Sequence, residues 1–297
     1  MSTHLEIRGI IPAICTPFHP DESIHVEALR ELVRRMLAAG VHGIFAAGSM
    51  GEGYALSLAD REVVFGTVVG EVAGRVPVLG GAGAITTRQA AEQARLATGC
   101  GVDALSVITP HFIVPTQEEL YRYHTEVAQA AQLPCLLYNH PRRTHVRIHP
   151  VTAARLEQAG AAVGIKDSSG DLANTIEYVS GCSADFAVMN GHDALVFPAL
   201  VAGAKGAVAA TGNIVPRLLV DIYDATLAGD FAAARAAQAR LGPLRHAFGL
   251  GRGAAMVKTA LGLMGLDVGP AARPSAPLDA NAVTGLRAVL RDLGVLG

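Results

Sequence analysis

Short apolar segments recur along the chain, and each ends in Gly, Pro or a polar turn before a helix-like stretch begins. Eight such segments are found, at residues 9–16, 42–48, 76–83, 104–110, 134–139, 163–167, 186–191 and 207–212. The stretches between them, such as residues 26–39 and 58–73, repeat apolar side chains at helical spacing. Strands that alternate with helices predict an α/β fold with a parallel sheet, and eight units are the number that closes a (β/α)8 TIM barrel. An open doubly wound sheet is the structural alternative, although no Gly-x-Gly-x-x-Gly follows the first predicted strand.

The predicted strands stop after about Asn213, and only helical patterns follow. Residues 216–227, 231–241, 254–265 and 281–293 have helical periodicity and are separated by joints rich in Gly and Pro. One of these helices completes the barrel, and the others form a C-terminal helical appendage. We therefore expect a barrel over residues 1–228 and a C-terminal helical region over residues 229–297. Side chains suited to capping helices stand at Asp60, Thr87, Thr116 and Asp171.

Composition and charge exclude several classes of protein. Hydrophobic residues make up 51% of the chain and charged residues 17%, which is ample for a large core, and the net charge is −2. This charge gives no reason to expect a nucleic acid or an anionic membrane as partner. The longest apolar stretches are too short for a membrane span, and the first residues lack the pattern of a signal peptide, so we expect a cytoplasmic protein. The four cysteines are scattered and are expected to be free thiols.

A single lysine stands at the end of the sixth predicted strand. Val163, Gly164 and Ile165 lead to Lys166, and the polar turn Asp-Ser-Ser-Gly follows at once. An unpaired ammonium is costly to bury, so burial favours the neutral amine, which can attack a carbonyl to form a Schiff base. The alternative is a lysine whose charged end reaches solvent from the strand end.

Polar groups also follow the second and fifth predicted strands. Gly48, Ser49 and Met50 form a turn whose amides and hydroxyl can bind an anion, although an ordinary Gly-rich turn has the same composition. Tyr138 ends the fifth strand, where it can relay a proton, and the loop after it contains Arg142 and Arg143, which can hold a carboxylate or a phosphate. Packing under a helix for the Tyr and solvation for the Arg are the alternatives. The carboxyl ends of neighbouring strands meet at one edge, so these side chains and Lys166 could share a cavity.

These segments together resemble the dihydrodipicolinate synthase / N-acetylneuraminate lyase family of pyruvate-dependent class I aldolases. The resemblance runs from about residue 9 to residue 266. It rests on Gly-x-x-Gly-Glu at 48–52, Thr-Pro at 109–110, Tyr-Asn-x-Pro at 138–141, Gly-Ile-Lys at 164–166 and the Gly191 turn before Asp193. It implies a TIM barrel with C-terminal helices, assembled as a homotetramer that is a dimer of dimers.

The resemblance also implies the roles of individual residues. Lys166 would form the imine with pyruvate or another 2-oxo acid, and Tyr138 would relay protons together with Ser49. The turn at Gly48, Ser49 and Met50 would bind the carboxylate of pyruvate. No metal and no organic cofactor are implied, because the protonated imine itself accepts electrons. The remaining residues expected around the substrate are Arg143, Gly191, Val208, His111 and Phe112.

The sequence departs from the synthases of the family where its members differ. Met50 stands where those synthases have a second Thr, and Phe112 stands where they have the Tyr that reaches in from the neighbouring subunit to complete the relay. Arg143 matches the Arg that holds the carboxylate of their aldehyde substrate, but His145 replaces the Gly after the following Thr. Lyases acting on 2-keto-3-deoxy sugar acids tolerate more variation here, and their hydroxyl-rich substrates suit the side chains of His111, His140 and His145.

We therefore expect an aldolase or lyase that uses or forms pyruvate, with a 2-keto-3-deoxy sugar acid or a related 4-hydroxy-2-oxo acid as substrate. The alternatives are a 4-hydroxy-tetrahydrodipicolinate synthase, a dehydratase with the same imine chemistry, and a catalytically impaired homologue that binds 2-oxo acids. A metal-dependent class II aldolase is conceivable with 11 His residues, but their spacing is not that of a metal site.

Overall fold

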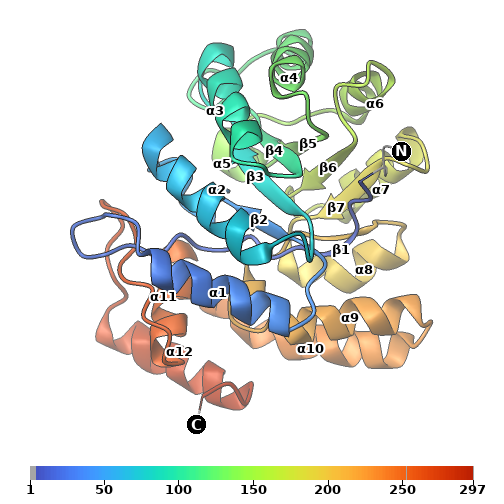
Figure 1. Ribbon diagram of the computed structural model, residues 1–297. Helices are drawn as coiled ribbons and strands as arrows, with labels where there is room; N and C mark the ends of the chain where they lie inside the picture. The colour runs from blue at the N-terminus through green and yellow to red at the C-terminus, as the bar shows by residue number, and fades with distance from the viewer. Residues whose placement is uncertain (1–4, 252, 297) are drawn as a thin grey trace.

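The computed structural model describes residues 5–251 and 253–296. Within these residues eight parallel strands form one sheet, in which each strand from the second to the seventh pairs with the next along the chain, and the first pairs with the eighth. The strands are β1 (Gly9–Ile10), β2 (Ile44–Ala46), β3 (Val78–Ala82), β4 (Ala104–Ile108), β5 (Cys135–Asn139), β6 (Gly164–Asp167), β7 (Ala187–Asn190) and β8 (Gly206–Ala207). Figure 1 shows them at the centre of the molecule with helices around them.

The ring of strands closes between the segment after β1 and β2. The amide of Ile14 donates to the carbonyl oxygen of Phe45 over 3.0 Å, and the amide of Phe45 donates to that of Pro12 over 2.9 Å. Ala13 and Phe45 form a parallel bridge at this point. The predicted (β/α)8 TIM barrel is thereby confirmed.

Helices follow the strands in alternation. The barrel helices are α1 (Val26–Ala38), α2 (Leu58–Val72), α3 (Thr87–Gly99), α4 (Gln117–Ala131), α5 (Pro141–Thr144), α6 (Pro150–Gln158), α7 (Leu172–Gly181) and α8 (Val196–Val201). They are followed by α9 (Pro216–Leu227), α10 (Phe231–Ala247), α11 (Gly253–Leu263) and α12 (Ala280–Asp292). These last four lie together with α1 on one side of the molecule in Figure 1. The expected C-terminal helices are thus present.

Some predicted boundaries differ from the observed ones. The strands predicted at 9–16 and 207–212 are observed only at 9–10 and 206–207. The amides of Ile11 and Ala13 still donate to β8 and the residues after it, but Pro12 between them has no N–H for a regular ladder. Helix α10 continues to Ala247, past the predicted end at residue 241 and with Pro243 inside it.

The helix caps were predicted correctly at two positions and wrongly at two others. Thr116 and Asp171 cap α4 and α7, where their side chains accept backbone N–H bonds. The prediction of Asp60 as a cap was wrong. The N-cap of α2 is Ser57, and Asp60 completes the capping box of Ser57 from the third helical position. The cap of α3 is Thr86 rather than Thr87.

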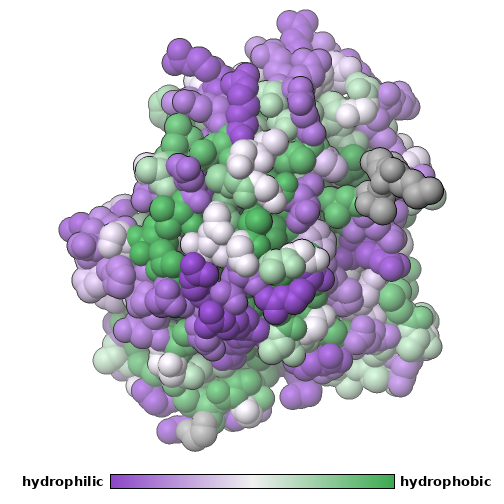
Figure 2. Space-filling model, viewed as in Figure 1, coloured by the Kyte–Doolittle hydropathy of each residue, from purple (hydrophilic) through white to green (hydrophobic). Residues whose placement is uncertain are grey.

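The C-terminal helices pack into the same hydrophobic core as the barrel. Leu241 and Leu244 of α10, Met256 of α11 and Leu286 of α12 are fully buried and belong to one cluster with strand residues such as Phe45. The boundary at residues 228 and 229 stays a prediction. Figure 2 shows polar and apolar surface interspersed on one face. Among the described helices we find none with the length and apolar character needed to cross a membrane.

A buried ion pair joins the turn after β2 to the C-terminal region. The Nζ of Lys258 on α11 lies 2.7 Å from Oε1 of Glu52, and the side chains are 2% and 0% exposed. The other carboxylate oxygen accepts the amide of Ala272 over 2.8 Å, while Lys258 donates to the carbonyl oxygen of Pro270 over 2.8 Å. The Nζ also lies 4.1 Å from the centroid of the Phe18 ring. The pair thus fixes the Gly48–Glu52 turn to segments more than 200 residues away.

Replacing Lys258 by Met should lower the free energy of unfolding by about 3–5 kcal/mol, because a buried carboxylate is left without its partner. Urea unfolding followed by circular dichroism measures the change. The double variant Glu52→Gln/Lys258→Met should recover part of the loss, since it removes both charges. Lys205→Met is the matched control, because Lys205 lies at the surface, where its Nζ donates to the carbonyl oxygen of Asp185. Equal losses in the single and double variants would show that the charges are not coupled.

Candidate active site

Lys166 and Tyr138 lie beside one another at the ends of adjacent strands. The register of β5 and β6 pairs Tyr138 with Lys166, and the residues are 3% and 4% exposed. The Nζ of Lys166 lies 3.9 Å from the ring centroid of Tyr138 and 4.9 Å from that of Phe45. No carboxylate among the described residues forms an ion pair with Lys166. The amine is therefore buried among aromatic rings and available to a carbonyl carbon.

The hydroxyl of Tyr138 extends from Lys166 toward the turn after β2. It donates to the hydroxyl of Ser49 over 3.4 Å, a long hydrogen bond of the kind that tightens when substrate binds. Burial alone would raise the pKa of Tyr138. The pKa is lowered by the charge of Lys166, by the hydrogen bonds with Ser49 and Lys166, and by the charge of Arg143. These effects together outweigh burial and bring the pKa below 10. A phenol with a lowered pKa gives up its proton more readily, as a relay requires.

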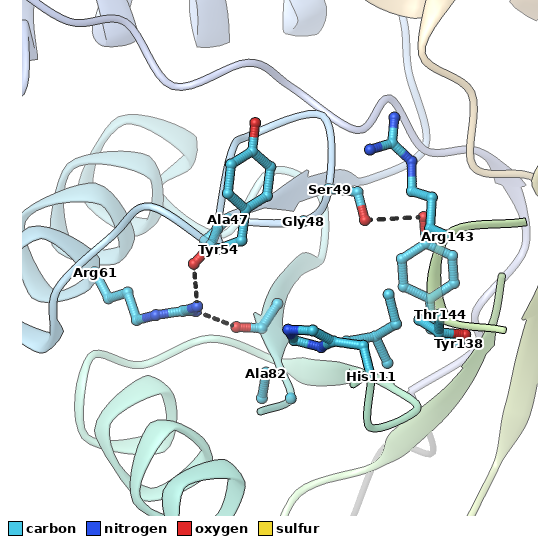
Figure 3. A pocket seen from close by; sticks show the side chains of 14 residues that line it. Ala47, Gly48, Ser49, Tyr54, Arg61, Ala82, His111, Tyr138, Arg143 and Thr144 are labelled. Carbon is cyan, nitrogen blue, oxygen red and sulfur yellow. Dashed lines mark hydrogen bonds between the residues drawn. The ribbon is translucent and has the colours of Figure 1, made fainter. Parts of the chain in front are cut away.

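The turn that carries Ser49 has little freedom to move. A Cβ at Gly48 would lie 2.5 Å from the ring of Phe45, and one at Gly53 would lie 2.1 Å from a backbone oxygen, so only glycine fits at these positions. The buried guanidinium of Arg61 donates to the carbonyl oxygens of Gly53 and Gly81. In Figure 3, Arg61 lies at one side of the cavity, and Ser49, Tyr138 and Arg143 lie at the other. The amides of the turn are thus held in place before any ligand arrives.

Most of the predicted site residues line connected cavities above the barrel. The larger cavity has a volume of about 380 Å³ and is lined by Gly48 and His111 among others. The smaller has a volume of about 130 Å³ and is lined by Lys166 and Met50 among others. Ser49, Tyr138 and Arg143 line both cavities, while Gly191 and Val208 line the smaller one. The structure thus places these residues together, and their roles stay predictions.

Phe112 and His145 lie apart from these cavities. The side chain of Phe112 is 91% exposed, although its φ of 74° is unusual for a bulky residue. His145 is exposed and ends the short helix α5 with a φ of 58°. The place of Phe112 in a neighbouring subunit's site stays a prediction.

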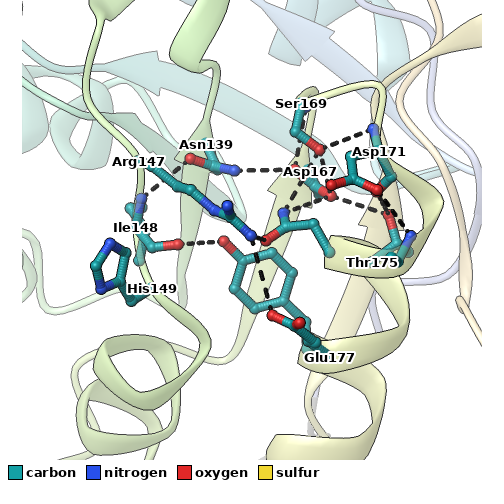
Figure 4. Close-up of polar contacts among 12 residues, drawn as sticks. Asn139, Arg147, Ile148, His149, Asp167, Ser169, Asp171, Thr175 and Glu177 are labelled. Atoms are coloured by element: carbon teal, nitrogen blue, oxygen red, sulfur yellow. Dashed lines mark hydrogen bonds and ion pairs between the residues drawn. The ribbon is translucent and has the colours of Figure 1, made fainter.

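The carboxylate of Asp167 fixes the end of β6. It is 2% exposed and accepts hydrogen bonds from Asn139 and Asn174 at 2.9 and 3.0 Å. It also accepts from Thr175 over 2.9 Å and from the amide and hydroxyl of Ser169 over 3.1 and 3.0 Å. Figure 4 shows this carboxylate between β5 and α7. Because successive strand residues face opposite sides, holding Asp167 toward the helices turns the preceding lysine into the barrel.

Several lining residues were missed by the sequence analysis. His192, directly after Gly191, could have been found from its place at the end of a predicted strand. Arg245 lies in the last turn of α10, beyond the predicted end of that helix at residue 241, and no local signal marks it. Within the described residues, no group of three or more His, Cys, Asp or Glu side chains is placed to bind a metal ion.

Comparison with known proteins assigns the chain to a family. The sequence profile of the Dihydrodipicolinate synthetase family matches residues 6–293. The chain belongs to this family. The chain is 39% identical to the 4-hydroxy-tetrahydrodipicolinate synthase of Methanopyrus kandleri, with 98% of each chain covered. It is 37% identical to the synthase of Methylococcus capsulatus, over 98% of this chain and all of that one.

Solved structures of family members have the same fold. Dihydrodipicolinate synthase from Thermotoga maritima superposes with a TM-score of 0.95 at 31% identity, covering 98% of this chain and 100% of that one. A prophage protein of the family from E. coli K12, solved in complex with pyruvate, has a TM-score of 0.93 at 29% identity, covering 97% and 99%. The protein is therefore a pyruvate-dependent lyase of the class I aldolase kind, a family that uses a lysine–pyruvate Schiff base and no external cofactor.

Replacing Tyr138 by Phe should slow turnover by roughly 10²- to 10⁴-fold, the usual contribution of a positioned acid–base group. Pyruvate binding should change much less, because the hydroxyl acts mainly on protons in transit. Steady-state kinetics with pyruvate and an aldehyde measure both effects. Tyr223→Phe is the control, since Tyr223 is a buried tyrosine on α9. Turnover of Tyr138→Phe at the wild-type rate would make Tyr138 a packing residue.

Proposed function

We propose that this protein joins pyruvate, held as an imine on Lys166, to a small aldehyde that bears a carboxylate. The reaction is of the type for which its relatives are named, 4-hydroxy-tetrahydrodipicolinate synthase. The observation that supports it most is the grouping of Lys166, Tyr138, Ser49 and Arg143 around shared space.

The choice of lysine follows from the environment of each lysine in the chain. The sequence contains three, Lys166, Lys205 and Lys258. Lys258 is bound to Glu52 on the far side of the turn, and Lys205 is bound to a backbone oxygen at the surface. Lys166 is left as the amine beside Tyr138, with the geometry that imine formation needs.

The reaction proceeds through an imine and an enamine. The amine of Lys166 attacks the ketone carbon of pyruvate, and loss of water gives the protonated imine. The relay of Tyr138 and Ser49 then takes a proton from the methyl group, the imine nitrogen accepts the electron pair, and the resulting enamine attacks the aldehyde carbon. The new alkoxide takes a proton from the relay of Tyr138 and Ser49, and water finally releases the product and the free lysine.

Two sets of groups that line the cavities suit the two carboxylates of the proposed substrates. The amides of Ser49 and Met50 and the Ser49 hydroxyl suit the carboxylate of pyruvate. Arg143 lies on the loop after β5 and lines both cavities, so its guanidinium suits the carboxylate of the aldehyde.

A second candidate is the cleavage of a 2-keto-3-deoxy sugar acid or another 4-hydroxy-2-oxo acid, the function that the sequence analysis placed first. It requires the same imine, and His111 and His140 line the cavities where hydroxyl groups of such a substrate would lie. Met50 in place of a second Thr also favours it. The names of the relatives support the synthase better, so we place it first. A dehydratase would use the same groups, whereas an impaired homologue fits less well with the intact pair of Lys166 and Tyr138.

We also propose a cytoplasmic homotetramer, in which one interface lies near the larger cavity. Phe112, Ile113 and Val114 are 91%, 59% and 66% exposed. Ile85, which lines a pocket together with His111, is 39% exposed. Exposed apolar side chains in one region favour burial against a second copy of the chain.

Borohydride treatment in the presence of pyruvate should add one covalent adduct, mapped to Lys166 by mass spectrometry. The adduct should be absent in Lys166→Ala, because the remaining lysines are bound elsewhere. Lys205→Ala is the matched control and should react like the wild type. An adduct on Lys205 or Lys258 would contradict the mechanism.

Arg143→Ala should raise KM for the carboxylate-bearing aldehyde by roughly tenfold or more, the value of a charged hydrogen bond, and should raise KM for pyruvate far less. Varying each substrate in turn measures the two constants. Arg147→Ala provides a control in the same loop, since Arg147 contacts Asn174 and Glu177 rather than the cavities. Equal increases for both substrates would place Arg143 at the pyruvate end.

A further inference from the structure

Arginine and histidine side chains gather around the smaller cavity beyond Lys166. The lining residues include His140 and Arg142 after β5, His192 after β7 and Arg245 from α10. Among the described residues, the buried nitrogens without a hydrogen-bond partner include Nδ1 of His140, Nδ1 of His192 and Nε of Arg245. Buried polar atoms are costly to leave unpaired, so their gathering in one cavity indicates a ligand that pairs with them.

Arg245 is held at this cavity by contacts of α10. Its guanidinium carbon lies 5.0 Å from the ring centroid of Phe248. Gln238, which precedes Arg245 by seven residues in the same helix, donates to the carbonyl oxygen of Asp193 over 3.0 Å and accepts the amide of Phe197 over 2.9 Å. The helix is therefore fixed to the loop that follows β7, and Arg245 is brought beside His192.

Positive charge predominates at this cavity. One carboxylate, that of Asp193, also lines it, and its Oδ1 accepts the amide and hydroxyl of Thr211. None of the described carboxylates forms an ion pair with Arg142, Arg143 or Arg245. An excess of positive charge in a cavity attracts an anion.

The histidines are neutral at pH 7. Burial, together with the charges of Lys166, Arg143 and Arg142, lowers the pKa of His140 to about 3. Burial also lowers the pKa of His192, and the charges of Arg245 and Arg142 act in the same direction while Asp193 opposes them. A neutral imidazole has one N–H to donate and one nitrogen to accept, so each suits an oxygen-rich group.

The donors present exceed what one carboxylate can accept. A carboxylate has about four acceptor positions, whereas each guanidinium alone has five N–H donors. Arg143 already suffices for the carboxylate of the proposed aldehyde. Arg142, Arg245 and the imidazoles are therefore available to a further group.

We propose that Arg245 and Arg142, with His140 and His192, form a second anion subsite that binds a further oxyanion of the acceptor aldehyde, a carboxylate or a phosphate. This inference rests on the proposed function and narrows its substrate class to aldehydes with such a group. Arg245 acts as a specificity residue supplied by the C-terminal region.

The test measures anion binding to the protein whose Lys166 carries the borohydride-reduced pyruvate adduct, so that the pyruvate end is occupied. Titration calorimetry with succinate, with inorganic phosphate and with neutral succinamide separates carboxylate, phosphate and uncharged probes. Saturable binding of succinate or phosphate is expected, and Arg245→Met should weaken it about tenfold or more. Arg240→Met is the matched control, because Arg240 lies exposed on the same helix and should bind as the wild type does.

The outcomes separate this subsite from the proposed function. Equal affinity in wild type and Arg245→Met, or equal binding of succinamide and succinate, would overturn the subsite. A preference for phosphate over succinate, or the reverse, identifies the oxyanion. If Arg245→Met does not fold, Arg142→Met must show the same loss. If the wild type forms no adduct, the proposed function fails, and the same titrations on the untreated protein still test the subsite.

Discussion

The buried ion pair between Glu52 and Lys258 is the contact on which the site most depends. Removing a carboxylate and an ammonium from water costs several kcal/mol per ion, so the pair is stable only with further hydrogen bonds, which Ala272 and Pro270 provide. Its Glu52 lies in the turn that presents Ser49, and its Lys258 lies on α11. The amides proposed to bind pyruvate are thus held from the C-terminal region, which is part of the active site's support rather than an appendage alone.

The sequence predicted the centre of this site because local patterns determine it. One apolar run ends in a Lys, and the run before it in the sequence ends in a Tyr, so both residues are identified as strand ends. Neighbouring strands of a parallel barrel bring such ends together. The register of β5 and β6 then places Tyr138 and Lys166 side by side. Gly48 was recognisable as a turn residue, and the observed clearance explains why a side chain cannot replace it.

The outer part of the site could not be predicted in this way. Arg245 reaches the cavity only because α10 packs against the loop after β7, a contact between residues far apart in sequence. The same holds for Glu52 and Lys258, whose pairing no spacing rule indicates. The end of β1 and the cap of α2 were misplaced for local reasons. Pro12 lacks the N–H that a regular ladder needs, and Ser57 and Asp60 both have side chains suited to capping, of which Ser57 takes the N-cap.

The net charge of the protein differs in sign from the charge that predominates around its smaller cavity. The chain carries a net charge of −2, yet the smaller cavity is lined by one carboxylate, Asp193, and by the cationic side chains of Arg142, Arg143, Arg245 and Lys166. A cleft of one sign within low-dielectric walls concentrates oppositely charged substrates and raises their rate of association. Pyruvate and an acidic aldehyde are both anions, so the same positive field serves both. Once pyruvate has formed the imine, its carboxylate offsets part of that field, and the charge of the outer arginines is what remains to attract the second substrate.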